Sequence, residues 1–164
     1  MTDLKPIETH YANCRFRSRI EARWAVFFDH LGIKWQYEPQ GFDLPSGPYL
    51  PDFLLELGDG VWWEVKGMPP NRRERDLRWE LMEATKQQVY IVHGSIPRDQ
   101  YDDPRIEHVS GTLVRWFIRP GWIGFVPASH EFDQAGTGAE LLRSAYRVAR
   151  SARFEHGEGM AVAS

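Results

Sequence analysis

The chain has 164 residues, of which 42% are hydrophobic and 13% are aromatic, including seven tryptophans. A chain of this length and composition can bury enough apolar surface to fold as one domain, which excludes a mostly disordered protein. Its 20 basic and 23 acidic residues give a formal net charge of −3. This balance neither indicates nor excludes nucleic-acid binding, which would depend on local basic patches.

The cysteine content and the hydropathy pattern narrow the setting of the protein. With Cys14 as the single cysteine, the chain cannot form an intrachain disulfide or a zinc site built from several cysteines. No apolar stretch is long enough to span a bilayer, and the N-terminus lacks the basic and apolar pattern of a secretory signal. These features predict a cytoplasmic protein without a membrane partner.

The first half of the chain predicts a helix followed by three strands. Residues 1–13 show little pattern and are expected to form a flexible leader. In residues 14–31 the apolar side chains recur at helical spacing, which predicts a helix. Residues 33–38 alternate as a strand does, and a polar connection follows them. Two further strands are expected within residues 49–66, joined by Gly58-Asp59-Gly60.

A second helix and an interior strand come next. Asn71 and Glu74 have the spacing of a capping box and predict a helix that continues to about Lys86. Residues 89–92 are wholly apolar, as expected of a strand with neighbours on both sides. Residues 97–105 are rich in proline and aspartate and predict a loop.

The last third predicts a hairpin and a terminal helix. Residues 112–118 and 122–126 flank Arg119-Pro120-Gly121, which is a strong turn signal. Thr137 with Glu140 fits a second capping box, opening a helix to about Arg153. Residues 155–164 are expected to be a flexible tail.

The order of these elements is helix, three strands, helix, strand, then an added hairpin and helix. It predicts an α/β fold with a mixed sheet, in a single domain over residues 14–154 with its core at about 14–93.

Charged residues interrupt the two apolar strands between residues 49 and 66. Because alternate residues of a strand share a face, Asp52, Glu64 and Lys66 are expected on one face of the hairpin, and the other face is wholly apolar. Charges within hydrophobic strands are costly unless something binds them. If the two apolar faces pack on one core, the charged faces must coincide.

The length of the turn decides whether the two carboxylates meet. A three-residue loop centred on Asp59 would set Asp52 opposite Lys66 and Leu54 opposite Glu64. The two carboxylates would then be diagonal neighbours about 7–8 Å apart, close enough to share a cation. A two-residue Asp-Gly turn would instead send them to opposite faces.

A third carboxylate, Glu21, lies at the edge of the apolar stripe of the first helix, with Arg17 one turn before it. A helix packed on the sheet could present Glu21 beside the charged face of the hairpin. Three carboxylates repel one another unless a hard cation such as Mg²⁺ binds them. The alternative is a solvated hairpin face on which Asp52 pairs with Lys66.

These residues carry a resemblance. An acidic residue on the first helix, Pro51-Asp52, and Glu64-Val65-Lys66 after a hairpin resemble the signature of the PD-(D/E)XK nucleases. The resemblance covers about residues 14–93 and implies a restriction-endonuclease-like αβββαβ core. The motifs are similar to those of small phage and bacterial proteins, and to TnsA-like and Holliday-junction-resolvase nucleases.

The resemblance implies that Asp52 and Glu64 bind a divalent metal, helped by the main-chain carbonyl of Val65 and by Glu21. It implies that Lys66 acts near the attacking water. The expected protein is therefore a Mg²⁺- or Mn²⁺-dependent DNA endonuclease, with Glu21, Asp52, Glu64 and Lys66 as its catalytic residues and no further small-molecule cofactor. Replacing Glu64 by alanine is expected to abolish cleavage and to leave the fold intact or even more stable, because a repelling charge is removed.

Two other classes stay open, a nuclease-like DNA-binding or assembly module without turnover and a small structural α/β protein. The DNA substrate, whether junction, flap, end or single strand, is open, as is RNA. Cutting two strands with one site per chain would need two copies, so a homodimer is open as well.

Three groups of arginines are candidates for contacts with DNA phosphates. They are Arg17 beside Glu21, then Arg72, Arg73 and Arg75 at the start of the second helix, and Arg143, Arg147 and Arg150 along the last helix. A solvated face is the alternative for the second and third groups. Another row, Arg15, Arg19 and Arg23, is expected on the solvent side of the first helix.

Overall fold

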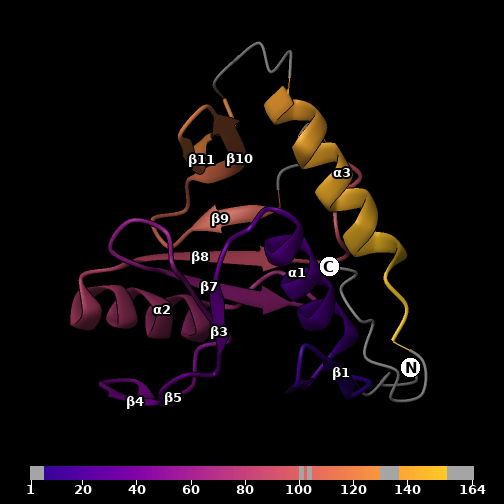
Figure 1. Cartoon of the computed structure of the whole chain (residues 1–164). Helices are drawn as coiled ribbons and strands as arrows, with labels where there is room; N and C mark the ends of the chain where they lie inside the picture. The colour runs from indigo at the N-terminus through magenta and orange to yellow at the C-terminus, as the bar shows by residue number, and fades with distance from the viewer. Residues whose placement is uncertain (1–5, 100–101, 103–104, 130–136, 155–164) are drawn as a thin grey trace.

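A computed structural model describes residues 6–99, 102, 105–129 and 137–154 of the chain. Its centre is a seven-stranded mixed sheet in the order β11-β10-β9-β8-β7-β6-β3 (Figure 1). The strands are β3 (Trp35–Tyr37), β6 (Phe53–Leu55), β7 (Val61–Lys66), β8 (Gln88–His93), β9 (Ile106–His108), β10 (Leu113–Arg119) and β11 (Trp122–Pro127). Strands β7 and β8 are parallel and the other neighbours are antiparallel, which confirms the predicted α/β class with a mixed sheet.

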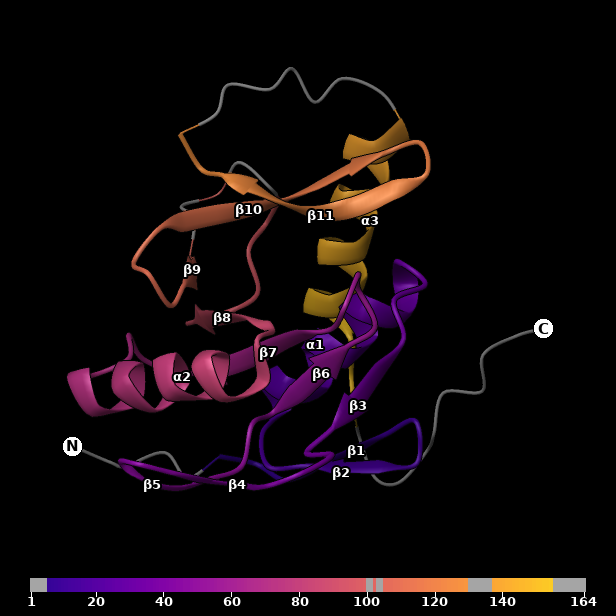
Figure 2. The same cartoon turned by 90° about the vertical axis from the view of Figure 1, so that its left-hand side faces the viewer.

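Helices cover both faces of this sheet. Helices α1 (Arg19–His30) and α3 (Thr137–Ser151) pack together over one face, and α2 (Arg72–Thr85) covers the other (Figures 1 and 2). The core beneath α1 is aromatic, and its largest side chains are fully buried. They include Trp24, Phe27 and Phe28 of α1 with Trp63 and Trp116 of the sheet. Among the described residues, no helix is both long and apolar enough to cross a membrane.

The helix starts follow from local side-chain caps. Ser18 caps α1, and its hydroxyl accepts a hydrogen bond from the Glu21 amide at 3.3 Å. At α2 both bonds of the predicted capping box between Asn71 and Glu74 are present, so that prediction is confirmed.

The first helix begins five residues later than predicted. Residues 14–16 belong to a small hairpin of β1 (Thr9–Tyr11) and β2 (Cys14–Phe16), whose turn has positive φ angles at Ala12 and Asn13. Such a turn matches the twist of paired strands. The apolar periodicity misled because Phe16 joins the same core as the helix while standing on a strand.

The strand predicted from Tyr49 is also divided. Tyr49 ends a second small hairpin, β4 (Phe42–Leu44) with β5 (Gly47–Tyr49), and the main-sheet strand begins at Phe53. Pro51 has no amide hydrogen to donate to a sheet ladder, so it separates the two strands. Asp52 therefore lies just before β6 rather than inside it.

The register of the central hairpin, which is formed by β6 and β7, differs from the prediction by two residues. Phe53 pairs with Trp63 and Leu54 with Trp62, so the predicted pairing of Leu54 with Glu64 is wrong. The loop spans residues 56–60, longer than the Gly58–Gly60 turn signal indicated. Because side chains alternate with a period of two, a two-residue shift keeps the same residues on each face. Extending this register by one residue sets Asp52 opposite Glu64.

The later elements agree well with the sequence. Strand β8 has a neighbour on each side, as its apolar run predicted. Strands β10 and β11 form the predicted hairpin, with Arg119 paired to Trp122, and Figure 2 shows this hairpin beside α3. Strand β9 follows the predicted loop and was not foreseen. The predicted tail, 155–164, and the side chain of Thr137 lie outside the described residues.

Candidate active site

Asp52, just before β6, and Glu64, on the neighbouring strand β7, are buried side by side. Their residues are 3% and 1% exposed. The Asp52 amide donates to Glu64 Oε1 at 3.1 Å, and the Val65 amide donates to Asp52 Oδ2 at 2.8 Å. Each carboxylate thus binds the backbone of the opposite segment, which confirms that they share a face. The alternative of a solvated hairpin face is wrong, because this face lies under α2.

Arg78 of α2 forms an ion pair with Glu64. This residue was not identified from the sequence. Its side chain is 1% exposed, and its Nη2 lies 3.2 Å from Glu64 Oε2. Its Nη1 donates to the Glu74 carbonyl oxygen, and its guanidinium lies 5.6 Å from the centre of the Tyr49 ring. The signal was available, since Arg78 stands three residues before the fully buried Leu81 on the inner side of α2.

Arg17 forms an ion pair with Asp52. Its Nη2 lies 2.7 Å from Asp52 Oδ1 and its Nε 2.7 Å from Glu38 Oε1. Arg17 precedes the Ser18 cap, so it stands outside the helix, which corrects its predicted place one helical turn before Glu21. Its side chain remains 57% exposed, so this pairing leaves part of the guanidinium open to solvent.

Glu21 lies at the predicted seam between α1 and the sheet, and it is 7% exposed. Its Oε1 accepts a hydrogen bond from the Ser18 hydroxyl at 2.7 Å, and its Oε2 accepts one from the Tyr37 hydroxyl at 2.5 Å. The Tyr37 oxygen in turn accepts the Arg17 amide at 3.1 Å. Glu21 is therefore linked to the Asp52 side of the site through Tyr37 and Arg17.

The electrostatics of the site centre on Asp52. Burial raises the pKa of its carboxyl well above the usual range, and the charges of Glu64 and Glu21 raise that pKa further. The Val65 amide and the Lys66 ammonium offset part of this pKa increase. An ionised Asp52 is therefore held against a strong local preference for neutrality, and an added cation would relieve it.

The carboxylate oxygens of the site are the kind of ligand that a hard divalent cation prefers. Asp52 and Glu64 offer four carboxylate oxygens, each bound to one hydrogen-bond donor, and each oxygen has a second lone pair. Within the described ranges, no three acidic, histidine or cysteine side chains are grouped so as to hold a metal ion. The structure thus brings Asp52 and Glu64 together as a pair and leaves Glu21 in its own hydrogen bonds.

Lys66 ends β7, two residues beyond Glu64. Its Nζ lies 3.8 Å from Glu74 Oε1, and its side chain is 31% exposed. The predicted alternative of an Asp52–Lys66 pair is wrong, because Asp52 pairs with Arg17. The main chain of Val65 is part of the site through its amide, and a role for its carbonyl stays a prediction.

The other predicted arginines lie on α2 and α3. Arg72, Arg73 and Arg75 are exposed on the first turn of α2, close in sequence to Glu74, the partner of Lys66. Arg143 and Arg147 are exposed on α3, whereas the half-buried Arg150 donates to the Pro97 carbonyl oxygen at 3.3 Å. Arg23, predicted to face solvent, is half-buried too.

Comparison of the sequence with models of known protein families found no match, and a search of curated proteins found none either.

Proposed function

We propose that the chain is a metal-dependent DNA endonuclease of the PD-(D/E)XK kind. The observation that carries the proposal is the buried pair of Asp52 and Glu64, each hydrogen-bonded to the backbone beside the other, with Lys66 two residues further on. The order α1, β3, β6, β7, α2, β8 supports it as well, because it is the order that the resemblance implies. The hairpin of β10 and β11 and helix α3 then stand as additions to that core.

The cost of the arrangement favours a binding site over a purely structural role. Burying a carboxylate costs several kcal/mol even after the protein relaxes around it. Here two carboxylates are buried against each other, and the Glu21 carboxylate adds to their repulsion. If these positions were purely structural, apolar residues would make the sheet more stable. Binding of a cation would explain why two carboxylates are buried there instead.

Asp52 and Glu64 would hold Mg²⁺ or Mn²⁺, together with the Val65 carbonyl and Glu21 that the resemblance adds. Such an ion polarises a phosphate oxygen and lowers the pKa of a bound water. Arg78 fixes the orientation of Glu64, and the Val65 amide fixes that of Asp52. Lys66, partly exposed at the end of β7, would orient the attacking water or stabilise charge on the phosphorane.

DNA would approach where the partly exposed side chains of Arg17 and Lys66 reach solvent. Arg72, Arg73 and Arg75 begin α2 close to Lys66 in sequence, where they could bind phosphates on one side of the scissile bond. Arg143 and Arg147 offer a second exposed row on α3. When the binding constant is plotted against salt concentration on logarithmic axes, loss of each phosphate contact should reduce the slope by about one.

One observation favours a second candidate, a nuclease-like DNA-binding or assembly module without turnover. Arg17 and Arg78 already supply positive charge to Asp52 and Glu64. In such a module these two guanidiniums would replace the metal permanently. The two functions differ in whether Asp52 exchanges Arg17 for a divalent ion.

Incubation of the protein with supercoiled plasmid and with single-stranded DNA, with Mg²⁺, Mn²⁺ or chelator, separates these functions. Lys66→Ala should reduce metal-dependent cleavage by about 100-fold or more. The matched control is Lys86→Ala, which removes an exposed lysine at the far end of α2 and should leave cleavage unchanged. DNA binding without cleavage would favour the silent module, and neither binding nor cleavage would favour a structural protein.

A further inference from the structure

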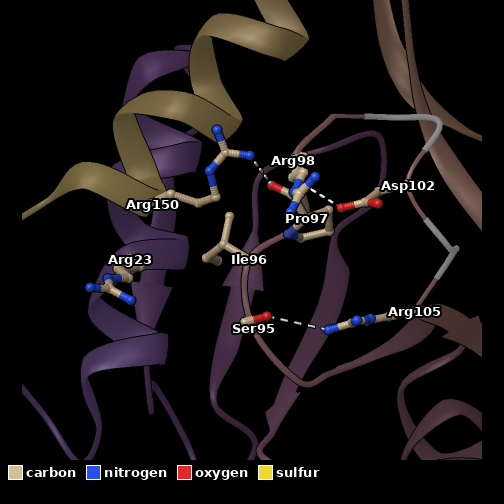
Figure 3. A pocket seen from close by; sticks show the side chains of 8 residues that line it. All are labelled: Arg23, Ser95, Ile96, Pro97, Arg98, Asp102, Arg105 and Arg150. Atoms are coloured by element: carbon tan, nitrogen blue, oxygen red, sulfur yellow. Dashed lines mark hydrogen bonds between the residues drawn. The ribbon is translucent and has the colours of Figure 1, made fainter.

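A second polar feature lies beyond the end of β8, where a cavity of about 550 Å³ opens between α1, α3 and the described residues between β8 and β9 (Figure 3). Four arginines from four parts of the chain line it, together with one carboxylate, Asp102. The arginines are Arg23 of α1, Arg98 after β8, Arg105 before β9 and Arg150 of α3. A cavity of this volume is large enough for a small ligand.

Among the described residues, few carboxylates accompany the four arginines of this cavity. Within the described part of the chain, none of the four guanidiniums lies within ion-pair distance of a carboxylate. Asp102 instead accepts a hydrogen bond from the Arg98 main-chain amide at 2.7 Å. Asp102 is the one carboxylate among the described residues that line the cavity, against four arginines.

The guanidiniums also retain unused donors. Arg105 Nη1 donates to the Ser95 hydroxyl and Arg150 Nη1 to the Pro97 carbonyl oxygen, both at 3.3 Å, as Figure 3 shows. The Nε of Arg23 is buried and has no hydrogen-bond partner among the described residues. A guanidinium carries five N–H donors, so other residues that the structure describes use only a minority of the donors of these four arginines. Buried donors without partners are costly, which points to an anion that completes them.

The cavity lies at the same end of the sheet as the carboxylate pair. His93, the last residue of β8, is in register with Lys66, and the Gly94 amide donates to the Lys66 carbonyl oxygen at 2.9 Å. Ser95 follows directly. On the other side, Arg23 stands on α1 two residues after Glu21. The two ends of the cavity are thus tied to the two elements that carry the site.

We propose that this cavity binds a phosphate group. Planar guanidinium forks match the oxygens of a phosphate and bind it with two hydrogen bonds each. The phosphate could come from the backbone of a nucleic acid or from a free phosphate compound. The first source rests on the proposed nuclease function, because it would place a second phosphate of the same strand near the cleaved one.

Binding measurements without catalytic metal test the cavity separately from cleavage. In chelator, the protein is titrated with inorganic phosphate by calorimetry, and with a labelled single-stranded oligonucleotide by fluorescence anisotropy at several salt concentrations. The double variant Arg98→Gln/Arg105→Gln should weaken phosphate binding by about tenfold or more, since it removes two positive charges and their hydrogen bonds to the phosphate. The control Arg15→Gln/Arg119→Gln removes the same charge from two exposed residues outside the cavity.

The two titrations distinguish the sources of the phosphate. Weaker oligonucleotide binding with a smaller salt slope in the double variant assigns the cavity to the nucleic-acid backbone. Loss of phosphate binding with unchanged oligonucleotide binding assigns it to a free phosphate compound. If the double variant and the control behave alike in both titrations, the proposal is overturned, whether or not the protein cleaves DNA. Arg23→Gln repeats the test if the double variant does not fold.

Discussion

Asp52 and Glu64 are both carboxylates paired with an arginine, but the two arginines differ greatly in solvent exposure. The partner of Asp52 is Arg17, whose side chain is more than half exposed, whereas the partner of Glu64 is the fully buried Arg78. If Asp52 is replaced, water can solvate the exposed Arg17 guanidinium. If Glu64 is replaced, water has little access to the buried Arg78 guanidinium. Substitutions at the two carboxylates should therefore have different effects on stability.

Glu64→Ala should destabilise the protein by about 3–5 kcal/mol, because it leaves the Arg78 guanidinium buried without its counter-charge. This reverses the sequence-based expectation of an intact fold. Glu64→Gln keeps an oxygen that can accept one of the two hydrogen bonds, and it should lose less. Urea denaturation of both variants gives the two values. An alanine variant as stable as the wild type would contradict the buried pair.

Asp52→Asn should remove a pH dependence from the stability of the protein. Because the pKa of Asp52 is raised in the folded state, the folded protein binds a proton that the unfolded chain has already released. The free energy of unfolding should therefore fall as the pH rises from about 4, the usual aspartate pKa, through the raised folded pKa.

The asparagine variant cannot titrate at this position and still accepts the Val65 amide. We expect it to be at least as stable as the wild type at neutral pH and to show a flatter profile. Denaturation from about pH 4 to pH 8 measures both curves. Equal slopes for the two proteins, or an asparagine variant weaker throughout, would contradict a raised pKa of Asp52 in the folded protein.

At the scale of elements, α2 links the stability of the fold to the geometry of the site. Its capping residue Glu74 contacts Lys66 through its side chain and Arg78 through its carbonyl oxygen. The helix start therefore positions both the lysine and the arginine that holds Glu64.

Asn71→Ala removes the cap of this helix and should cost about 1 kcal/mol of stability. Because the Glu74 amide loses its acceptor, Asn71 Oδ1, the turn that positions Lys66 and Arg78 is held less firmly, and cleavage should decrease more than this stability loss alone explains. Thermal unfolding and cleavage rates measure the two effects. Asn71→Ser restores a capping oxygen and should recover both, and failure of serine to do so would contradict a capping role.

The sequence predicted the elements that carry their own signals. The Asn71 capping box, the apolar run of β8 and the Pro120-Gly121 turn each act locally, and each is found in the structure. The small hairpins of β1 with β2 and β4 with β5 were missed because three-residue strands are too short to show a period. The register of the central hairpin was missed because its loop is longer than its turn residues indicate.

The same distinction applies to the candidate site. Asp52 and Glu64 could be paired from the sequence because alternation within two adjacent strands decides which side chains share a face. Arg78 could not be assigned to Glu64 in this way, because its contact depends on how α2 packs across the sheet. Arg17 was placed near the site, but its partner depended on where the first helix begins.

At the scale of the whole molecule, the described structure gathers its unusual charges at one end of the sheet. The carboxylate pair lies at the hairpin, the exposed arginines of α2 begin nearby, and the arginine cavity lies beyond β8. The net charge of −3 conceals this distribution, because acidic residues elsewhere balance the local positive charge. A phosphate backbone passing this end would meet both kinds of group.

The rate of plasmid cleavage as Mg²⁺ is titrated, compared between the wild type and Asp52→Asn, tests the central claim most directly. The asparagine variant is chosen because its fold should be intact. We expect the wild-type rate to rise with Mg²⁺ to saturation and the variant rate to be lower by about 100-fold or more, since a metal ligand is lost. No cleavage by the wild type at any Mg²⁺ concentration, or equal rates for the two proteins, would contradict the account.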